Sequence, residues 1–215
     1  ERLDAVLYEQ ERGGDLEGAL AAYQAIEADI LAMDLEPGQP GHADQQKVLA
    51  YTLLRQGNIL RQLDREDEAL ALAERELAAA RASGDPLTEA RTAFSYGTSL
   101  IASGRTEVGL EKLERARALF EAGEGRQFRQ GLGWYWIIRA DLGQAGYVPA
   151  GPPEIKEFAN RALALLEPIE NWAGVARAYA ARAKAREAMG DAAGAAQDRA
   201  EEQRFNAMVG NRGGD

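Results

Sequence analysis

The sequence predicts an all-α fold of repeated helical hairpins, and two observations lead to it. The stretch Gly57–Pro86 reads as the end of one helix, a turn and a second helix, and Gly97–Gly123 repeats this pattern 40 residues later. A fixed period of roughly 20–50 residues is typical of repeat architectures. Hydrophobic residues make up 46% of the chain and aromatic residues only 7%, so the core must be built largely from Ala and Leu, which favour helices.

The first part of the chain predicts two helices and a loop. Apolar residues recur at spacings of three and four over residues 16–30, which indicates an amphipathic helix. A shorter amphipathic helix is expected before it, with apolar residues at Leu3, Val6 and Leu7. Residues 34–43 contain two prolines and two glycines, which indicates a loop inserted into the repeat pattern.

The rest of the chain predicts eight further helices. Gly84 suits a helix C-cap, Asp85 an N-cap and Pro86 the first helical position, so one helix ends and another begins there. Residues 146–153 read as a second insertion, and the Gly-rich tail 210–215 is expected to fray. The predicted helices span residues 44–63, 66–82, 86–103, 106–122, 127–145, 154–167, 170–189 and 192–208.

Five turn positions organise these helices into five hairpins within a single domain, 1–215. The predicted turn residues are Gly14, Asp64, Gly104, Gly143 and Gly190. Five residues after four of them stands a small residue, which lets the two helices of a hairpin approach closely: Ala19, Ala69, Gly109 and Ala195. The predicted repeats cover approximately residues 1–33, 44–83, 86–122, 127–167 and 170–208, with insertions at 34–43 and 146–153.

These small residues and turns resemble the tetratricopeptide repeat (TPR) family. The residues that match its small positions are Gly57, Gly97, Ala183, Ala69, Ala195 and Ala116. Glu76 and the bulky Trp136 depart from the pattern. The 40-residue spacing resembles longer-helix variants found in bacterial regulators and kinesin light chains. The resemblance covers nearly the whole chain and implies a right-handed superhelix whose first helices line a concave groove.

In that family the groove usually holds a peptide or a partner's helix. The resemblance therefore implies a non-enzymatic protein–protein interaction scaffold. The positions carried over residue by residue as groove candidates are Tyr51, Arg55, Asn58, Arg91, Phe94, Thr98, Gln130, Trp134, Arg177 and Lys184. Their aromatic and cationic members suit a partner with an acidic residue beside an apolar anchor, for which Phe94 is the expected contact. The alternative is that several of them pack between helices.

The family's clamp for chaperone C-terminal carboxylates needs a set of Lys, Asn and Arg residues, of which only Asn58 is present. We therefore expect no clamp of that kind.

The cluster Trp134–Trp136 is the densest aromatic run, and three consecutive helical residues cannot all face one way. Structural packing is the favoured interpretation of this cluster, with a ligand pocket as the alternative.

Composition argues against several function classes. The net charge is −10, and residues 1–46 carry 11 acidic and two basic side chains, so a nucleic-acid partner is not expected. These acids either steer a basic partner or form a solvated cap. The chain has no Cys, and its single His, His42, is expected to lie exposed in a loop. No motif for a nucleophile, phosphate loop or metal site appears, so we expect no enzyme, cofactor or metal.

We expect a cytoplasmic protein, because neither a signal peptide nor an apolar run long enough to span a membrane is visible. The chain begins at Glu1, which leaves open whether upstream residues hold a signal or a further domain.

The partner is expected to be another protein or a peptide, with a homo-oligomer as an open alternative. The second candidate function is a self-assembly or small-molecule and peptide-sensing module of a bacterial regulator.

Overall fold

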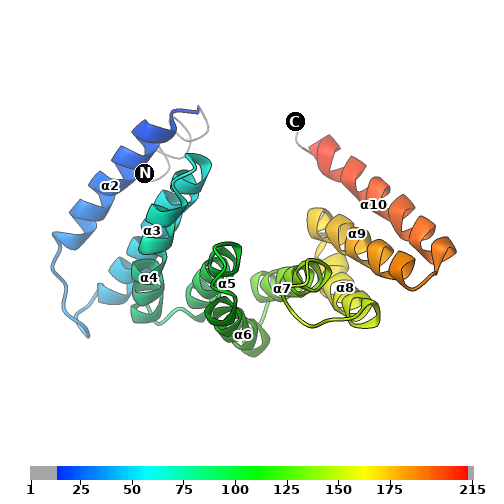
Figure 1. Cartoon of the computed structure of the whole chain (residues 1–215). Coiled ribbons are helices and arrows are strands. Elements are labelled where there is room, and N and C mark those ends of the chain that lie inside the picture. The colour runs from blue at the N-terminus through cyan, green and yellow to red at the C-terminus, as the bar shows by residue number, and fades with distance from the viewer. Residues whose placement is uncertain (1–13, 213–215) are drawn as a thin grey trace. The chain divides into compact units, whose positions relative to one another are not determined.

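The computed structural model describes residues 14–212, with side chains up to 209, and all regular structure in this part of the chain is helical (Figure 1). The chain divides into two compact units, Glu1–Leu119 and Phe120–Asp215. The predicted helix with Leu3, Val6 and Leu7 and the tail 213–215 lie outside the described residues. No helix in the described part is long and apolar enough to cross a bilayer.

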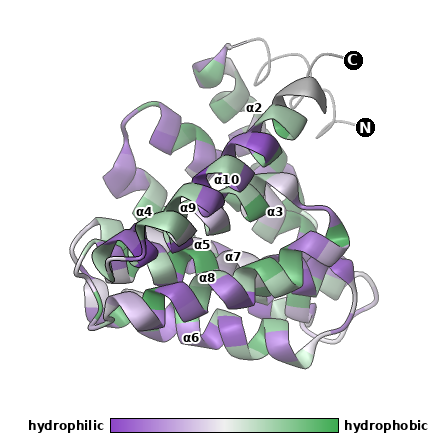
Figure 2. Cartoon of the chain, turned by 90° about the vertical axis from the view of Figure 1, so that its right-hand side faces the viewer, coloured by the Kyte–Doolittle hydropathy of each residue, from purple (hydrophilic) through white to green (hydrophobic). Residues whose placement is uncertain are grey.

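In the described residues of the first unit, five helices follow one another in antiparallel hairpins. They are α2 (Leu16–Leu31), α3 (His42–Gln62), α4 (Glu66–Ala82), α5 (Pro86–Ala102) and α6 (Thr106–Ala122). Helix α3 packs against α2, α4 and α5, and its Leu53 and Ile59 are buried in a core with Tyr23 of α2. Each helix buries one face and exposes the other, and the ribbon of α6 accordingly carries both hydrophilic and hydrophobic segments (Figure 2).

The second unit contains two further hairpins. Its elements are α7 (Arg126–Gln144), α8 (Pro152–Leu166), the short 3-10 helix η2 (Glu167–Ile169), α9 (Trp172–Ala188) and α10 (Ala192–Arg212). Helix α9 packs against α7, α8 and α10. The core joins Ile137 of α7, Leu166 of α8 and Val175 of α9, all fully buried. Large side chains cluster here, whereas α9 itself contributes mostly Ala to the interior.

The predicted helix boundaries are close to the observed ones because caps define them locally. The side chain of Asp85 accepts a hydrogen bond from the Leu87 backbone N–H at 3.0 Å, and Pro86 begins α5 as predicted. Asn171 caps α9 in the same way by accepting from the Gly174 N–H at 3.0 Å. Helix α8 begins two residues earlier than predicted, at Pro152, where the Glu154 side chain accepts from the Gly151 N–H at 2.6 Å. The largest difference is at α10, which continues to Arg212 instead of ending at residue 208, so residues 210–212 of the tail expected to fray are helical.

Four of the five predicted turn residues have a left-handed backbone. The φ angles are 85° at Gly14, 58° at Asp64, 83° at Gly104 and 80° at Gly190. The fifth prediction, Gly143, is wrong, because this residue lies inside α7 and the left-handed residue is Gly146. Neighbouring side chains pack closely at Gly143, because a Cβ atom placed there would lie 3.0 Å from the Ala150 Cβ atom and 3.1 Å from the Ile155 side chain.

The close approach predicted at Gly109 is confirmed. A Cβ atom on Gly97 would lie 2.8 Å from the Gly109 carbonyl oxygen, and one on Gly109 would lie 2.7 Å from the Gly97 carbonyl oxygen. Helices α5 and α6 therefore touch through their backbones. Gly57, which occupies the position of Gly97 one repeat earlier, has room for a methyl group, since the nearest atom is Arg61 Nη1 at 3.8 Å.

Among the residues that the structure describes, each unit buries one carboxylate. Glu76 on α4 is 4% exposed and accepts a hydrogen bond from Thr92 Oγ1 at 2.8 Å. Burial raises the pKa of Glu76 to about 7, although the Thr92 hydrogen bond and the charge of Arg61 act in the opposite direction. Asp198 on α10 is 2% exposed and is paired with two arginine side chains of α9.

Candidate functional site

The predicted groove residues Tyr51 and Arg91 lie together in a cavity between α3 and α5. We call it the α3–α5 cavity; its volume is about 310 Å³, and it is lined by Lys47, Val48, Ala50, Tyr51, Leu54, Thr88, Arg91 and Thr92. Helical spacing brings these residues to one face of α3, because positions separated by three and four residues are neighbours on a helix. The Tyr51 and Val48 side chains are 41% and 39% exposed, which is unusual for large apolar groups.

The two cations of this cavity differ in their partners. The Lys47 ammonium lies 2.5 Å from the Asp85 carboxylate. Burial raises the pKa of Asp85, but the hydrogen bonds from Lys47, Thr88 and Leu87 outweigh it, so the pKa lies below its usual value. Arg91 is exposed and forms no hydrogen bond or ion pair with any residue that the structure describes. Its guanidinium is therefore available to an incoming anion.

A second cavity lies between α7 and α9 in the other unit. This α7–α9 cavity has a volume of about 520 Å³ and is lined by Gly143, Gln144, Ala150, Pro152, Ile155, Lys184, Ala185 and Ala188. Ala150 belongs to the connection between α7 and α8 that the sequence marks as an insertion. Lys184 is its one cation, and it is exposed. The lining contains no aromatic ring.

The other predicted groove residues are less accessible. Arg177 is exposed, but its guanidinium donates to Asp141 Oδ2 at 2.7 and 3.1 Å, so its charge is already neutralised. Phe94 is partly buried and does not line the α3–α5 cavity, so Tyr51 is the more exposed aromatic residue there. The remaining candidates are partly buried between helices: Arg55, Asn58, Thr98, Gln130 and Trp134.

The aromatic run of α7 is a packing cluster rather than an open pocket. Tyr135 is 1% exposed, whereas Trp134 and Trp136 are partly buried. The Trp136 ring stacks on Phe158 of α8 at a centroid distance of 5.6 Å, and the Arg161 guanidinium lies over the Trp136 ring, 4.7 Å from its centroid. The cluster therefore joins the two helices of one hairpin.

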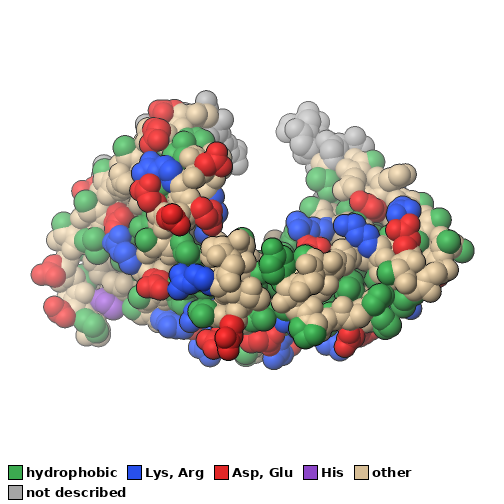
Figure 3. Space-filling view, in the orientation of Figure 1, with side chains coloured by type: hydrophobic (Ala, Val, Ile, Leu, Met, Phe, Trp, Pro, Cys, Tyr) green, Lys and Arg blue, Asp and Glu red, His purple; other side chains and the backbone are tan. Residues whose placement is uncertain are grey.

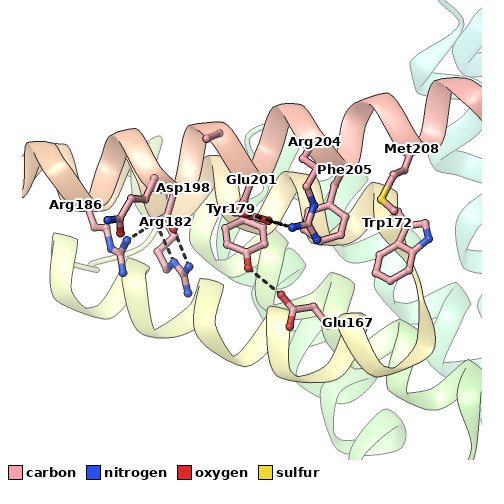
Figure 4. A pocket seen from close by; sticks show the side chains of 12 residues that line it. Glu167, Trp172, Tyr179, Arg182, Arg186, Asp198, Glu201, Arg204, Phe205 and Met208 are labelled. Carbon is pink, nitrogen blue, oxygen red and sulfur yellow. Dashed lines mark hydrogen bonds and ion pairs between the residues drawn. The ribbon is translucent and has the colours of Figure 1, made fainter.

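A third cavity, larger than the α3–α5 and α7–α9 cavities, was not predicted from the sequence. This α9–α10 cleft has a volume of about 810 Å³ and includes Glu167 at the end of α8 (Figure 4). The Phe205 ring stacks on Trp172 at 5.3 Å and on Tyr179 at 5.8 Å, and the Tyr179 hydroxyl donates to Glu167 at 3.0 Å. Burial and the hydrogen bond to Glu167 raise the pKa of Tyr179. The seven-residue spacing of Trp172 and Tyr179, which places both rings on one face of α9, is a sequence signal from which this cleft could have been found.

The structure places the single histidine of the sequence in a helix and not in a loop. His42 was expected in an exposed loop, but it is the first residue of α3 and is partly buried, because the left-handed Gly41 ends the loop one residue earlier. No group of three or more His, Asp or Glu side chains is placed to hold a metal ion among the described residues. Acidic and basic side chains are interspersed on the face that Figure 3 shows.

In each unit, antiparallel helical hairpins pack in chain order, which defines an α-helical repeat protein with a TPR-like fold. The structure of BtubC from P. vanneervenii is similar, with a TM-score of 0.73 and 15% identity over 94% of this chain and 77% of that one. The putative kinesin light chain of Podosopora anserina, with nearly identical TPR-like repeats, gives a TM-score of 0.66 and 15% identity over 97% of this chain and 94% of that one.

MamA is a third similar structure, with a TM-score of 0.56 and 16% identity over 94% of this chain and 95% of that one. No protein-family model matches the chain, and neither does any curated protein. At this level of identity the comparisons establish the fold. The predictions of an all-α, TPR-like helical-repeat fold are therefore confirmed, while the longer 40-residue variant stays a prediction.

Proposed function

We propose that this chain is a non-enzymatic scaffold that binds a peptide segment of another protein in the α3–α5 cavity. The observation that supports this most strongly is that Arg91, which has no partner among the described residues, lines the same cavity as the exposed Tyr51 ring. Exposed aromatic and arginine side chains in a concave site are the residues that most often dominate protein–protein binding. A TPR-like fold is well suited to such a role, because its first helices present side chains along an extended surface.

The chemistry of the cavity indicates the partner. Tyr51, Val48 and Leu54 offer an apolar surface, and about 310 Å³ holds one large side chain or two small ones. Arg91 at the edge can form a bidentate pair with a carboxylate. The partner segment is therefore expected to carry an acidic residue next to a bulky apolar residue.

The first prediction concerns this binding. Binders are selected from a displayed peptide library in which Asp or Glu precedes a bulky apolar residue, and their affinities are measured by calorimetry. Tyr51→Ala should weaken binding by about 2 kcal/mol or more, because it removes the apolar contact. Arg91→Ala should weaken it by about 1 kcal/mol or less, because an exposed ion pair contributes little.

The matched control is Arg105→Ala, which removes an exposed arginine that lines neither the α3–α5 nor the α7–α9 cavity. It should bind the selected peptides like the unmodified protein. If Tyr51→Ala keeps full affinity and an unchanged melting temperature, the α3–α5 cavity is not the binding site.

The second candidate function is a small-molecule-sensing module, and the α9–α10 cleft favours it. The cleft is large enough for a small ligand, and its stacked Trp172 and Phe205 rings provide apolar surface. A compound that binds there should raise the melting temperature of the unmodified protein. The same compound should have no effect after Tyr179→Arg, which fills the cleft; an equal effect in both would exclude this site.

A further inference from the structure

We propose that the α7–α9 cavity is a second peptide-binding subsite, which takes an acidic side chain next to a bulky aliphatic residue. A partner with two such motifs could then engage the chain twice. The proposal extends the proposed function to the other unit, but the cavity stands on its own geometry and can be tested separately.

The cavity is built from parts that the structure holds in place. The Gln144 side-chain amide at the end of α7 donates to the Ala181 carbonyl oxygen of α9 at 2.9 Å, which ties the two helices together. The connection between α7 and α8 is anchored by Val148, which is only 4% exposed. The Tyr147 N–H donates to the Leu142 carbonyl oxygen at 2.9 Å and closes the turn after α7. Because these walls are fixed in the free chain, little ordering is needed on binding.

The charges of α9 single out Lys184 as the group that meets an anion. Arg177 and Lys184 are seven residues apart, on the same face of the helix, and both are exposed. Asp141 neutralises Arg177, whereas Lys184 forms no ion pair or hydrogen bond with any residue that the structure describes. An ammonium group without a partner at the edge of an apolar cavity attracts a carboxylate.

The lining of the α7–α9 cavity determines which side chain can stand next to the acidic residue in the bound peptide. Glycine and alanine at Gly143, Ala150, Ala185 and Ala188 leave about 520 Å³ of space, with Ile155 as the largest apolar wall. A bulky aliphatic side chain fits this space and buries its surface there. A planar ring finds no aromatic partner in the lining, which separates this cavity from the α3–α5 cavity with its Tyr51.

The subsite is expected to bind more weakly than the α3–α5 cavity. Its single cation lies near the C-terminal ends of α7 and α9, where helix dipoles place partial negative charge. Its contribution should therefore be measured by linking two motifs in one peptide, since binding of the first raises the effective concentration of the second.

The test uses a peptide probe with two motifs, an acidic–aromatic one and an acidic–leucine one, joined by a long Gly/Ser linker and amidated at its C-terminus. Amidation removes the terminal carboxylate, so only side-chain carboxylates can bind. Lys184→Ala should weaken the two-motif probe by about tenfold or less. The effect should disappear when the acidic residue of the leucine motif is replaced by its amide.

A second variant tests the cavity itself without removing charge. Ala150→Leu places a side chain in the cavity and should weaken the two-motif probe like Lys184→Ala. Ala145→Leu is the matched control, because it changes an exposed residue of the same connection that does not line the cavity. Lys156→Ala is the control for charge, since that lysine on α8 lines neither cavity.

The outcomes separate the two proposals. If Arg91→Ala and Tyr51→Ala weaken the probe while Lys184→Ala and Ala150→Leu leave it unchanged, the α7–α9 subsite is wrong and the proposed function stands. If only the α7–α9 variants weaken it, the α3–α5 assignment is wrong instead. A loss of affinity for Lys156→Ala equal to that for Lys184→Ala would show non-specific charge attraction and would overturn the subsite.

Discussion

The two units bury a carboxylate in opposite ways. In the first unit, Glu76 accepts a hydrogen bond from the Thr92 hydroxyl and forms no ion pair with any described residue. Burial therefore raises the pKa of Glu76 to about 7. In the second unit, Asp198 accepts from Arg182 Nε at 3.0 Å and Nη2 at 2.7 Å, and Arg186 Nη1 lies 3.1 Å away. Glu76 is buried without a charged hydrogen-bond partner among the described residues, whereas Asp198 forms ion pairs with two arginines that pack around it.

The difference teaches what a buried charge needs. The guanidinium of Arg182 is itself partly buried, which lowers its pKa, but the hydrogen bond and charge of Asp198 raise it further, so the net shift is upward. The Arg186 guanidinium is held beside Asp198, because its Nη1 also donates to the Gly194 carbonyl oxygen at 2.9 Å. A buried carboxylate that is paired with two guanidinium groups remains ionised. A buried carboxylate with a single neutral hydrogen-bond donor has a raised pKa and is more readily protonated.

The largest expected effect breaks the network of the second unit. Asp198→Asn removes the negative charge between Arg182 and Arg186 and should lower the free energy of unfolding by about 3–5 kcal/mol. Urea denaturation measures this. Glu201→Gln is the matched control on the same helix, because its partner Arg204 is exposed, and it should cost less than about 1 kcal/mol. Equal effects of the two substitutions would show that the network is not needed.

The next effect is a pH dependence that belongs to the first unit. Because the pKa of Glu76 is about 7 in the folded chain and about 4.5 in the unfolded one, the folded state binds more protons between these values. The free energy of unfolding should therefore fall as pH rises from about 4.5 to about 7, by about 3 kcal/mol from this residue.

The measurement is the difference between the unmodified protein and Glu76→Gln across this pH range. The variant should lack this part of the slope and should be the more stable protein above pH 7. Glu111→Gln removes one exposed charge on α6 and should leave the slope unchanged. Parallel curves for the unmodified protein and Glu76→Gln would contradict the raised pKa.

The smallest effect sharpens the comparison within the first unit, between two glycines that the repeat pattern makes equivalent. Gly97→Ala should destabilise by about 1–3 kcal/mol, because the added methyl group meets the Gly109 carbonyl oxygen. Gly57→Ala should instead stabilise by about 0.5–1 kcal/mol, because the site has room and Ala favours helices. Thermal unfolding of both variants checks the opposite signs; the same sign for both would mean that the two hairpins pack alike.

The sequence alone determined the helical elements and their order. Helices 66–82 and 106–122 were predicted with the boundaries that α4 and α6 have, and the cap at Asp85 was recognised from three adjacent residues. These signals act within about one helical turn, so they can be read from neighbouring positions. The resemblance to the TPR family placed Tyr51 and Arg91 on the groove-facing side of their helices, and both residues line the α3–α5 cavity.

Only the tertiary structure decided which of the predicted site residues are exposed and unpaired, and can therefore contact a partner. Asp141 neutralises Arg177 from 36 residues away, and Arg182 meets Asp198 on another helix, so no local pattern predicts either pair. Gly143 and Gly146 are both glycines near the same helix end, and only the second has a left-handed backbone. The close packing at Gly143 comes from Ala150 and Ile155, which lie beyond α7 in the chain. Burial of Glu76 likewise depends on α5 packing against α4. Helix ends are set by neighbouring residues along the chain, whereas charge pairing, pKa and cavities are set by residues that only folding brings together.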